Sequence, residues 1–143
     1  MAAARAHIAV LVAGVIALLA GGARAGDVAE GRILYQTECA YCHFSAELPL
    51  HGGGATGLSP IPVMMATYGP KLIGIVGRAA ASDPSFNYSD AFLAQTRGLV
   101  WTEQTLDRFM TDAREMIPGT RMFYRQPDAA VRRKLLAYLE TTG

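Results

Sequence analysis

The stretch Glu38-Cys39-Ala40-Tyr41-Cys42-His43, or ECAYCH, contains both cysteines of the 143-residue chain. The two thiols lie three positions apart, and an imidazole directly follows the second. Three chemistries use such a C-x-x-C pair: a redox-active disulfide, half of a zinc site, and the covalent attachment of haem. The residues around the pair have to distinguish among them.

The zinc and dithiol interpretations find little support along the chain. A structural zinc site needs four nitrogen or sulfur ligands, and beyond the N-terminal segment only Cys39, Cys42, His43 and His51 qualify, so four candidates barely exist. His51 itself is better interpreted as a solvated loop histidine. A thioredoxin-like dithiol is expected beside a βαβ pattern, whereas a helical pattern precedes Cys39 and no alternating strand follows.

C-x-x-C-H is the signature of haem attachment. Thiols at i and i+3 lie on one turn of a helix, so each can add to a vinyl group on one edge of the macrocycle. The next residue then brings an imidazole beneath the iron. The motif is short and therefore remains a hypothesis at this point. Export of the chain favours it, since thiols without such a use would oxidise outside the cytoplasm.

The N-terminal residues are typical of a secretory signal peptide. Basic residues precede the apolar stretch 8–20, and the small-residue exit Ala23-Arg24-Ala25 follows. We expect residues 1–25 to be cleaved and the mature domain, 26–143, to be periplasmic. The alternative is an uncleaved anchor, but the 13 uncharged residues of 8–20 are fewer than the roughly 20 that span a bilayer as a helix.

The composition bounds the partners. A chain of 143 residues is about one domain. Removing Arg5 and Arg24 reduces the 13 basic residues to 11, against 12 acidic ones, so the mature net charge is −1. A nucleic-acid-binding domain would show a clear basic excess, and we therefore expect no nucleic acid as a partner.

A second axial ligand would decide what an iron held by His43 can do, because a methionine or histidine there closes the site. Met110 falls with Leu106 and Phe109 on the apolar stripe of a predicted helix and is interpreted as a core residue. Met116 and Met122 flank 117–121, a turn-rich segment that can wrap over a flat cofactor. The methionines after the signal are Met64, Met65, Met110, Met116 and Met122.

The loop Pro118-Gly119-Thr120-Arg121-Met122 resembles the P-G-T-K-M ligand loop of class I cytochrome c, the mono-haem electron carriers of mitochondria and bacterial periplasm. By this match Met122 is the axial ligand and Met116 a distant second. The resemblance covers nearly all of 26–143. Gly69 to Arg78, GPKLIGIVGR, is similar to the family's G-P-x-L-x-G-x-x-G-R, and Phe86-Asn87-Tyr88-Ser89 to its F-x-Y-[ST].

The resemblance implies a site built around one covalent haem c. Cys39 and Cys42 would form the thioethers, and His43 and Met122 would ligate the iron. Pro70 would accept a hydrogen bond from Nδ1 of His43, which fixes the imidazole. The remaining cofactor-binding residues would hold or cover the inner propionate: Arg78, Tyr88, Trp101 and Thr120.

Two departures from the family are visible. Phe109 stands where many members carry a tyrosine hydroxyl near the methionine sulfur, so a hydrogen bond that tunes the potential is expected to be missing. Around the ligand loop, Arg121 and Arg125 stand in place of the usual lysines.

The implied fold class is all-α, the class I cytochrome c fold, with N- and C-terminal helices packed around the haem. The first helix is expected to be capped by Asp27, with Glu30 completing a capping box, and the last by Asp128. Between them, a short helix is expected after Ser89 and a longer one after Thr102. The longer helix is expected to face the core with Leu106, Phe109, Met110 and Ala113.

The two terminal helices are expected to pack on each other. Gly31 and Tyr35 would meet Leu135 and Tyr138, and the missing side chain of Gly31 would allow close approach.

Residues 44–68 form a long loop insertion, rich in glycine and proline. About 25 residues exceeds the 12–15 usual for loops in compact domains, which leaves two interpretations. The insertion either docks a partner or is a passive packed or mobile segment.

The expected function is one-electron transfer by a low-spin His/Met haem, without enzymatic activity of its own. The donor would be a dehydrogenase or quinol oxidase complex and the acceptor an oxidase or reductase, with no stable membrane insertion after cleavage. Two alternatives stay open. Without Met122 on the iron, the chain would be a haem sensor or weak peroxidase, and it could also be the haem subunit of a larger dehydrogenase.

Overall fold

The computed structural model describes residues 25–43 and 68–143. Every regular element in these two ranges is helical, apart from a single antiparallel bridge between Ala79 and Val100. The helical prediction is thus confirmed for the described residues. The predicted signal peptide and the predicted insertion lie outside them, except for Ala25 and Tyr68.

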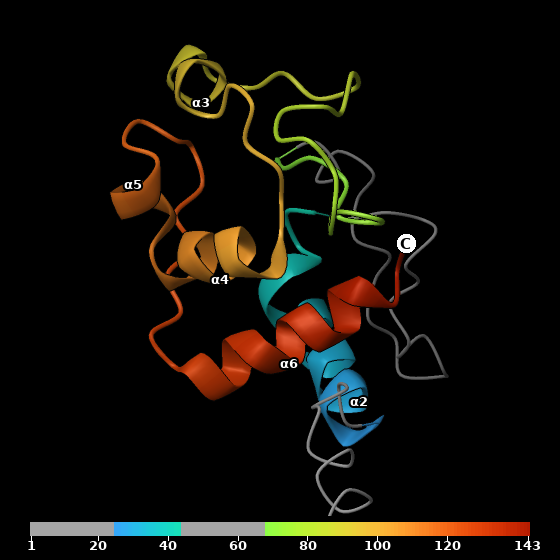
Figure 1. Ribbon diagram of the computed structural model, residues 1–143. Helices are drawn as coiled ribbons and strands as arrows, with labels where there is room; N and C mark the ends of the chain where they lie inside the picture. Colours follow the sequence, from blue (N-terminus) through green and yellow to red (C-terminus); the bar gives the residue numbers. More distant parts are fainter. Residues whose placement is uncertain (1–24, 44–67) are drawn as a thin grey trace, which may run out of the picture.

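The elements follow one another in the order shown in Figure 1. No helix among the described residues has the length and apolar character needed to cross a membrane. The elements are α2 (Ala25–Leu34), the π-helical turn η2 (Tyr35–Cys39), α3 (Asp90–Gln95), α4 (Glu103–Thr111), α5 (Ala113–Met116) and α6 (Ala129–Glu140).

Helices α2 and α6 cross and pack against each other, as Figure 1 shows. A Cβ atom on Gly31 would lie 1.9 Å from the carbonyl oxygen of Lys134 and 3.0 Å from Cβ of Tyr138. The rings of Tyr35 and Tyr138 contact each other in a tilted arrangement, with their centroids 5.4 Å apart. The predicted contact of the terminal helices is confirmed, and Gly31 allows it because any side chain would collide with α6.

Of the two predicted helix caps, the one at Asp128 is confirmed, and the helices predicted after Ser89 and Thr102 begin there with those residues as N-caps. Ser89 accepts from the amide of Phe92, Thr102 forms a capping box with Thr105, and Asp128 accepts from the amide of Ala130. The N-cap predicted for the first helix is wrong.

The first helix begins two residues earlier than its predicted cap. Because α2 starts at Ala25, Asp27 lies in the first turn, where its negative charge interacts favourably with the helix dipole. Its carboxylate lies 3.7 Å from Nε of Arg133 on α6, and Glu30 pairs with Lys134 instead of closing a capping box. Both acidic residues therefore tie α2 to α6.

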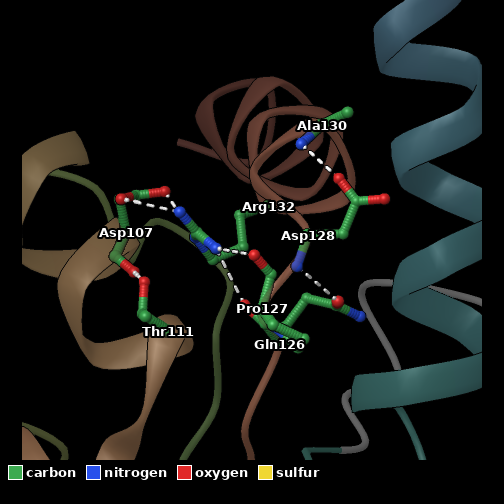
Figure 2. Close-up of polar contacts among 7 residues, drawn as sticks. All are labelled: Asp107, Thr111, Gln126, Pro127, Asp128, Ala130 and Arg132. Carbon is green, nitrogen blue, oxygen red and sulfur yellow. Dashed lines mark hydrogen bonds and ion pairs between the residues drawn. The ribbon is translucent and has the colours of Figure 1, made fainter.

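A buried arginine joins α6 to α4 and to the segment between them (Figure 2). Nε of Arg132 donates to Asp107 at 2.8 Å, and Nη1 donates to the carbonyl oxygens of Gln126 and Pro127 at 2.8 and 3.0 Å. The Arg132 side chain is only 10% exposed, so these bonds replace the water that the guanidinium loses. They fix the backbone where the chain enters α6.

The core lies between α6, α4 and the C-x-x-C-H motif. Leu106, Phe109 and Met110 of α4 and Ala113 of α5 are buried, as the sequence predicted. The ring of Trp101, just before α4, packs against that of Phe109, with the ring centroids 5.1 Å apart.

Candidate functional site

The C-x-x-C-H motif is wound tightly where η2 ends. The amide of Ala40 donates to the carbonyl oxygen of Tyr35 at 2.9 Å, and the amides of Cys42 and His43 both donate to that of Cys39, at 3.1 and 2.9 Å. The Tyr35 hydroxyl donates to the carbonyl of His43 at 2.9 Å, which fixes the end of the turn. The motif is therefore held in one conformation by its own backbone and by the core.

The imidazole of His43 is buried and oriented. Its Nδ1 lies 2.7 Å from the carbonyl oxygen of Pro70, so this nitrogen carries the proton and Nε2 is left with its lone pair. Burial lowers the pKa of His43, although the bond to the Pro70 carbonyl opposes that shift, so the ring is neutral near pH 7. A neutral imidazole whose Nε2 lone pair is held in one direction is suited to bind a metal ion.

Gly69 makes room for that ring. A Cβ atom at position 69 would lie 2.5 Å from Cε1 and 2.6 Å from Nδ1 of His43. The peptide that supplies the Pro70 carbonyl can approach the imidazole this closely because residue 69 has no side chain.

A cavity of about 360 Å³ opens beside the imidazole, within the usual size of small-molecule and cofactor sites. Its walls include Leu72, Ile75, Phe92 and Leu106, which are apolar side chains. Met116 is not among its lining residues. All nine residues predicted for the site line this one cavity: Cys39, Cys42, His43, Pro70, Arg78, Tyr88, Trp101, Thr120 and Met122.

The ligand loop is fastened by α3. Ser89, the N-cap of α3, donates from Oγ to the carbonyl of Gly119 at 3.5 Å, and Gln95 donates from Nε2 to that of Pro118 at 2.5 Å. Gly119 has a φ of +84°, a left-handed conformation that favours glycine. The turn before Met122 is thus set by glycine and by two side chains of α3.

Residues 121–126, which we call the methionine limb, alternate strictly in exposure. Side chains two positions apart on an extended segment project to the same side. Met122, Tyr124 and Gln126 are half-buried, whereas Arg121, Phe123 and Arg125 are exposed. The inward face therefore carries the predicted iron ligand.

The residues predicted for the inner propionate lie together but also bond to protein groups. Arg78 donates from Nη1 to the carbonyl of Ile73 at 3.0 Å, and the Tyr88 hydroxyl accepts from the amide of Asp83 at 3.3 Å. Trp101 is 5% exposed and Thr120 is 7% exposed. These bonds fix the guanidinium and the phenol at the wall of the cavity.

The state of the thiols argues against a redox dithiol. Both cysteines are free, and burial raises the pKa of the Cys39 thiol to about 12, with further contributions from Glu38 and Cys42. Redox-active cysteines have a lowered pKa, because the thiolate is the nucleophile.

The described residues also give no support to zinc. They contain no group of three or more His, Cys, Asp and Glu side chains that could hold a metal ion. His51, the fourth ligand that a zinc site would have needed, lies outside the described residues.

Comparison with known proteins identifies the class. No family model matches the chain. It is 35% identical over 122 residues to cytochrome c2 of Rhodopila globiformis, covering 85% of this chain and 98% of that protein. It is 39% identical over 98 residues to cytochrome c2 of Agrobacterium tumefaciens (strain II Chrys), covering 68% and 74%. Cytochrome c of Gibberella zeae is 32% identical over 116 residues, covering 80% and 93%.

The chain therefore belongs to the class I mono-haem cytochromes c. Its cofactor is one covalently bound haem c. The residues fit this group: two free thiols, a buried imidazole with its outer nitrogen engaged, and apolar walls all border one cavity. The C-x-x-C-H motif thus borders the cavity that could hold this cofactor.

Sequence reasoning missed a group of three hydrogen-bonded residues, of which Glu38 and Tyr124 line this cavity. The Tyr124 hydroxyl donates to Oε2 of Glu38 at 2.5 Å, and Nε2 of Gln126 donates to the same oxygen at 3.2 Å. Burial, together with the bond to Glu38, raises the pKa of Tyr124 well above its ordinary value, so the phenol remains a donor. The i, i+2 spacing from Met122 was the only signal in the sequence.

Proposed function

We propose that the chain is a one-electron carrier whose iron is ligated by His43 and Met122. The observation that carries the proposal is that both thiols, the oriented imidazole and the Met122 side chain line the same cavity. Membership of the cytochrome c family supports the electron-transfer role in general. When bound, haem c supplies the one-electron couple of its iron.

The residues of the chain would divide the work. Cys39 and Cys42 would tether the macrocycle, and the Pro70 carbonyl would keep the imidazole of His43 oriented and raise its basicity. The thioether of Met122 is a soft ligand, so it favours the reduced state relative to a second histidine. Arg78, Tyr88, Trp101 and Thr120 would offset the charge of the inner propionate.

A site closed by two protein ligands would carry electrons and would not act on a substrate. The open-site alternatives, a haem sensor or a weak peroxidase, need Met122 away from the iron. Met122 lies on the inward face of its limb, at the wall of the cavity that His43 also lines, which favours the carrier. The structure offers no feature in the described residues that favours a subunit of a larger dehydrogenase.

The exposed face of the methionine limb is the proposed point of electron exchange. Arg121, Phe123 and Arg125 are exposed there, and the guanidinium of Arg114 lies 4.0 Å from the centroid of the Phe123 ring. An aromatic ring held under a cation offers apolar contact within a basic surface. The partners would be a dehydrogenase or quinol oxidase complex as donor and an oxidase or reductase as acceptor.

We also propose that the chain works in the periplasm after loss of residues 1–25. Its bacterial relatives include cytochromes c2, and the N-terminal sequence has the pattern of a signal peptide. N-terminal sequencing of the secreted protein would test this, with Gly26 as the expected first residue.

Covalent attachment and reversible redox chemistry test the function together. The protein, expressed with a haem-attachment system, should keep its haem through denaturing electrophoresis and titrate as a single one-electron couple. Cys39→Ser with Cys42→Ser should lose the haem stain, because no thioether remains. Protein that stays colourless after such maturation, or that takes up no electron reversibly, contradicts the proposal.

A further inference from the structure

One carboxylate joins the two segments that meet at the cavity. Oε2 of Glu38 accepts from the Tyr124 hydroxyl at 2.5 Å and from Nε2 of Gln126 at 3.2 Å. Glu38 directly precedes Cys39, and its two donors lie 86 and 88 positions further along the chain. The first segment of the site is therefore hydrogen-bonded to the last by side chains alone.

Both donors share the inward face of the methionine limb with Met122. The exposure alternates from Met122 to Gln126, so Tyr124 and Gln126 are turned toward the body of the protein together with Met122. On an extended segment, fixing two side chains of one face also fixes the rotation of the segment. The bonds to Glu38 thereby set the direction in which the Met122 side chain leaves the backbone.

The backbone of the limb is anchored separately, on a different side. The carbonyl of Tyr124 accepts from the amide of Ala113 at 3.2 Å, and the amide of Gln126 donates to the carbonyl of Met110 at 2.9 Å. These bonds hold the limb to α4 and α5. Among the hydrogen bonds of the described residues, those of Glu38 are the ones that hold the limb to the C-x-x-C-H segment.

We propose that Glu38 is a positioning residue for the axial methionine. Its carboxylate fastens the methionine limb to the segment that carries Cys39 and His43, and this keeps Met122 seated over the cavity. The inference rests on the proposed ligation by Met122. Hydrogen bonds to an ionised acceptor are about twice as strong as neutral ones, so a half-buried carboxylate is suited to the task.

The affinity for added imidazole measures how readily Met122 and the methionine limb move away from the iron. The oxidised holoprotein is titrated with imidazole, and binding is followed by loss of the sulfur-to-iron charge-transfer band. Glu38→Ala should bind imidazole about tenfold more tightly than the parent, as expected when bonds to a charged group are lost. Tyr124→Phe removes only the hydroxyl and should give a smaller shift in the same direction, even if the Glu38 variant matures poorly.

A double variant and a matched control make the test specific. Tyr124→Phe should have no further effect in the Glu38→Ala background, because the hydroxyl has then already lost its acceptor. Glu30→Ala removes the other glutamate of the same helical run, which pairs with Lys134 on α6. It should bind imidazole like the parent, even where urea unfolding shows a similar loss of stability.

The outcomes separate this inference from the function on which it rests. Absence of the charge-transfer band in the parent protein overturns ligation by Met122, and the role of Glu38 with it. A band in the parent, with equal imidazole affinity for Glu38→Ala and Glu30→Ala, overturns the role of Glu38 alone. Additive shifts for Glu38→Ala and Tyr124→Phe also overturn it, because the two side chains would then act independently.

Discussion

At the scale of single residues, the imidazole of His43 is held from two sides. Its Nδ1 bonds to the Pro70 carbonyl at 2.7 Å, and the backbone of Gly69 lies directly against the ring. The motif in the sequence identified His43 and the resemblance identified Pro70. The sequence alone did not reveal why residue 69 is glycine, because that reason is a contact between segments 26 positions apart.

Gly69→Ala should displace the imidazole. The new methyl group would lie 2.5 Å from Cε1, and the ring cannot withdraw without losing its bond to Pro70. We expect the free energy of unfolding, measured with urea, to fall by about 1–3 kcal/mol, the usual cost of overpacking. A value equal to that of the parent would show that the contact is not tight.

At the scale of the elements, α2 and α6 cross and form the most extensive contact between the described helices. The sequence predicted that these helices meet, and the structure confirms it. The start of α2 was predicted wrongly, because Asp27 and Glu30 have the sequence of a capping box but bond to α6 instead. A tertiary ion pair competes for the same side chains as a local cap, and the local pattern cannot reveal it.

Gly31→Ala tests that crossing. In an isolated helix alanine is more favourable than glycine by about 1 kcal/mol, so local propensity alone predicts a more stable protein. The structure predicts the opposite sign, a loss of about 1–3 kcal/mol, because the new Cβ would lie 1.9 Å from the Lys134 carbonyl oxygen.

The matched control is Gly26→Ala in the same helix, where a Cβ atom would meet nothing within 4 Å. It should leave the melting temperature unchanged or slightly raised. If both alanine variants were equally stabilised, the close contact of α2 with Lys134 would be wrong.

At the scale of the whole molecule, charge is arranged locally. The full chain carries a formal net charge of only +1, but the outward face of the methionine limb presents Arg121 and Arg125. Arg125 lies 3.2 Å from Asp112, which partly neutralises it, whereas among the described residues Arg121 forms no ion pair and donates from Nη1 to the Asn87 carbonyl at 3.5 Å. Arg121 is therefore the stronger contributor to the field at the proposed point of electron exchange.

Arg121→Gln should slow oxidation of the reduced protein by ferricyanide by about two- to fivefold at low ionic strength, since one steering charge is lost. The difference should vanish in high salt. Arg133→Gln removes an exposed arginine that does not line the cavity beside His43, and it should leave the rate unchanged. Equal slowing by both variants would mean that electrons do not pass near Arg121.

The sequence predicted the helical class and the terminal contact, and the nine residues that it assigned to the site all line one cavity. The site residues could be named from the sequence because cofactor attachment imposes a fixed spacing on Cys39, Cys42 and His43, and because the ligand loop has its own turn residues. The link from Glu38 to Tyr124 escaped prediction, because neither residue belongs to a motif and 86 positions separate them. Such a contact depends on the folded path of both segments.

The most direct measurement is the near-infrared spectrum of the oxidised holoprotein and of two methionine variants. A sulfur-to-iron charge-transfer band should be present in the parent and in Met116→Ala, because Met116 does not line the cavity. The band should be absent in Met122→Ala. Its survival in Met122→Ala, or its loss in Met116→Ala, would contradict the claim that Met122 is the axial ligand.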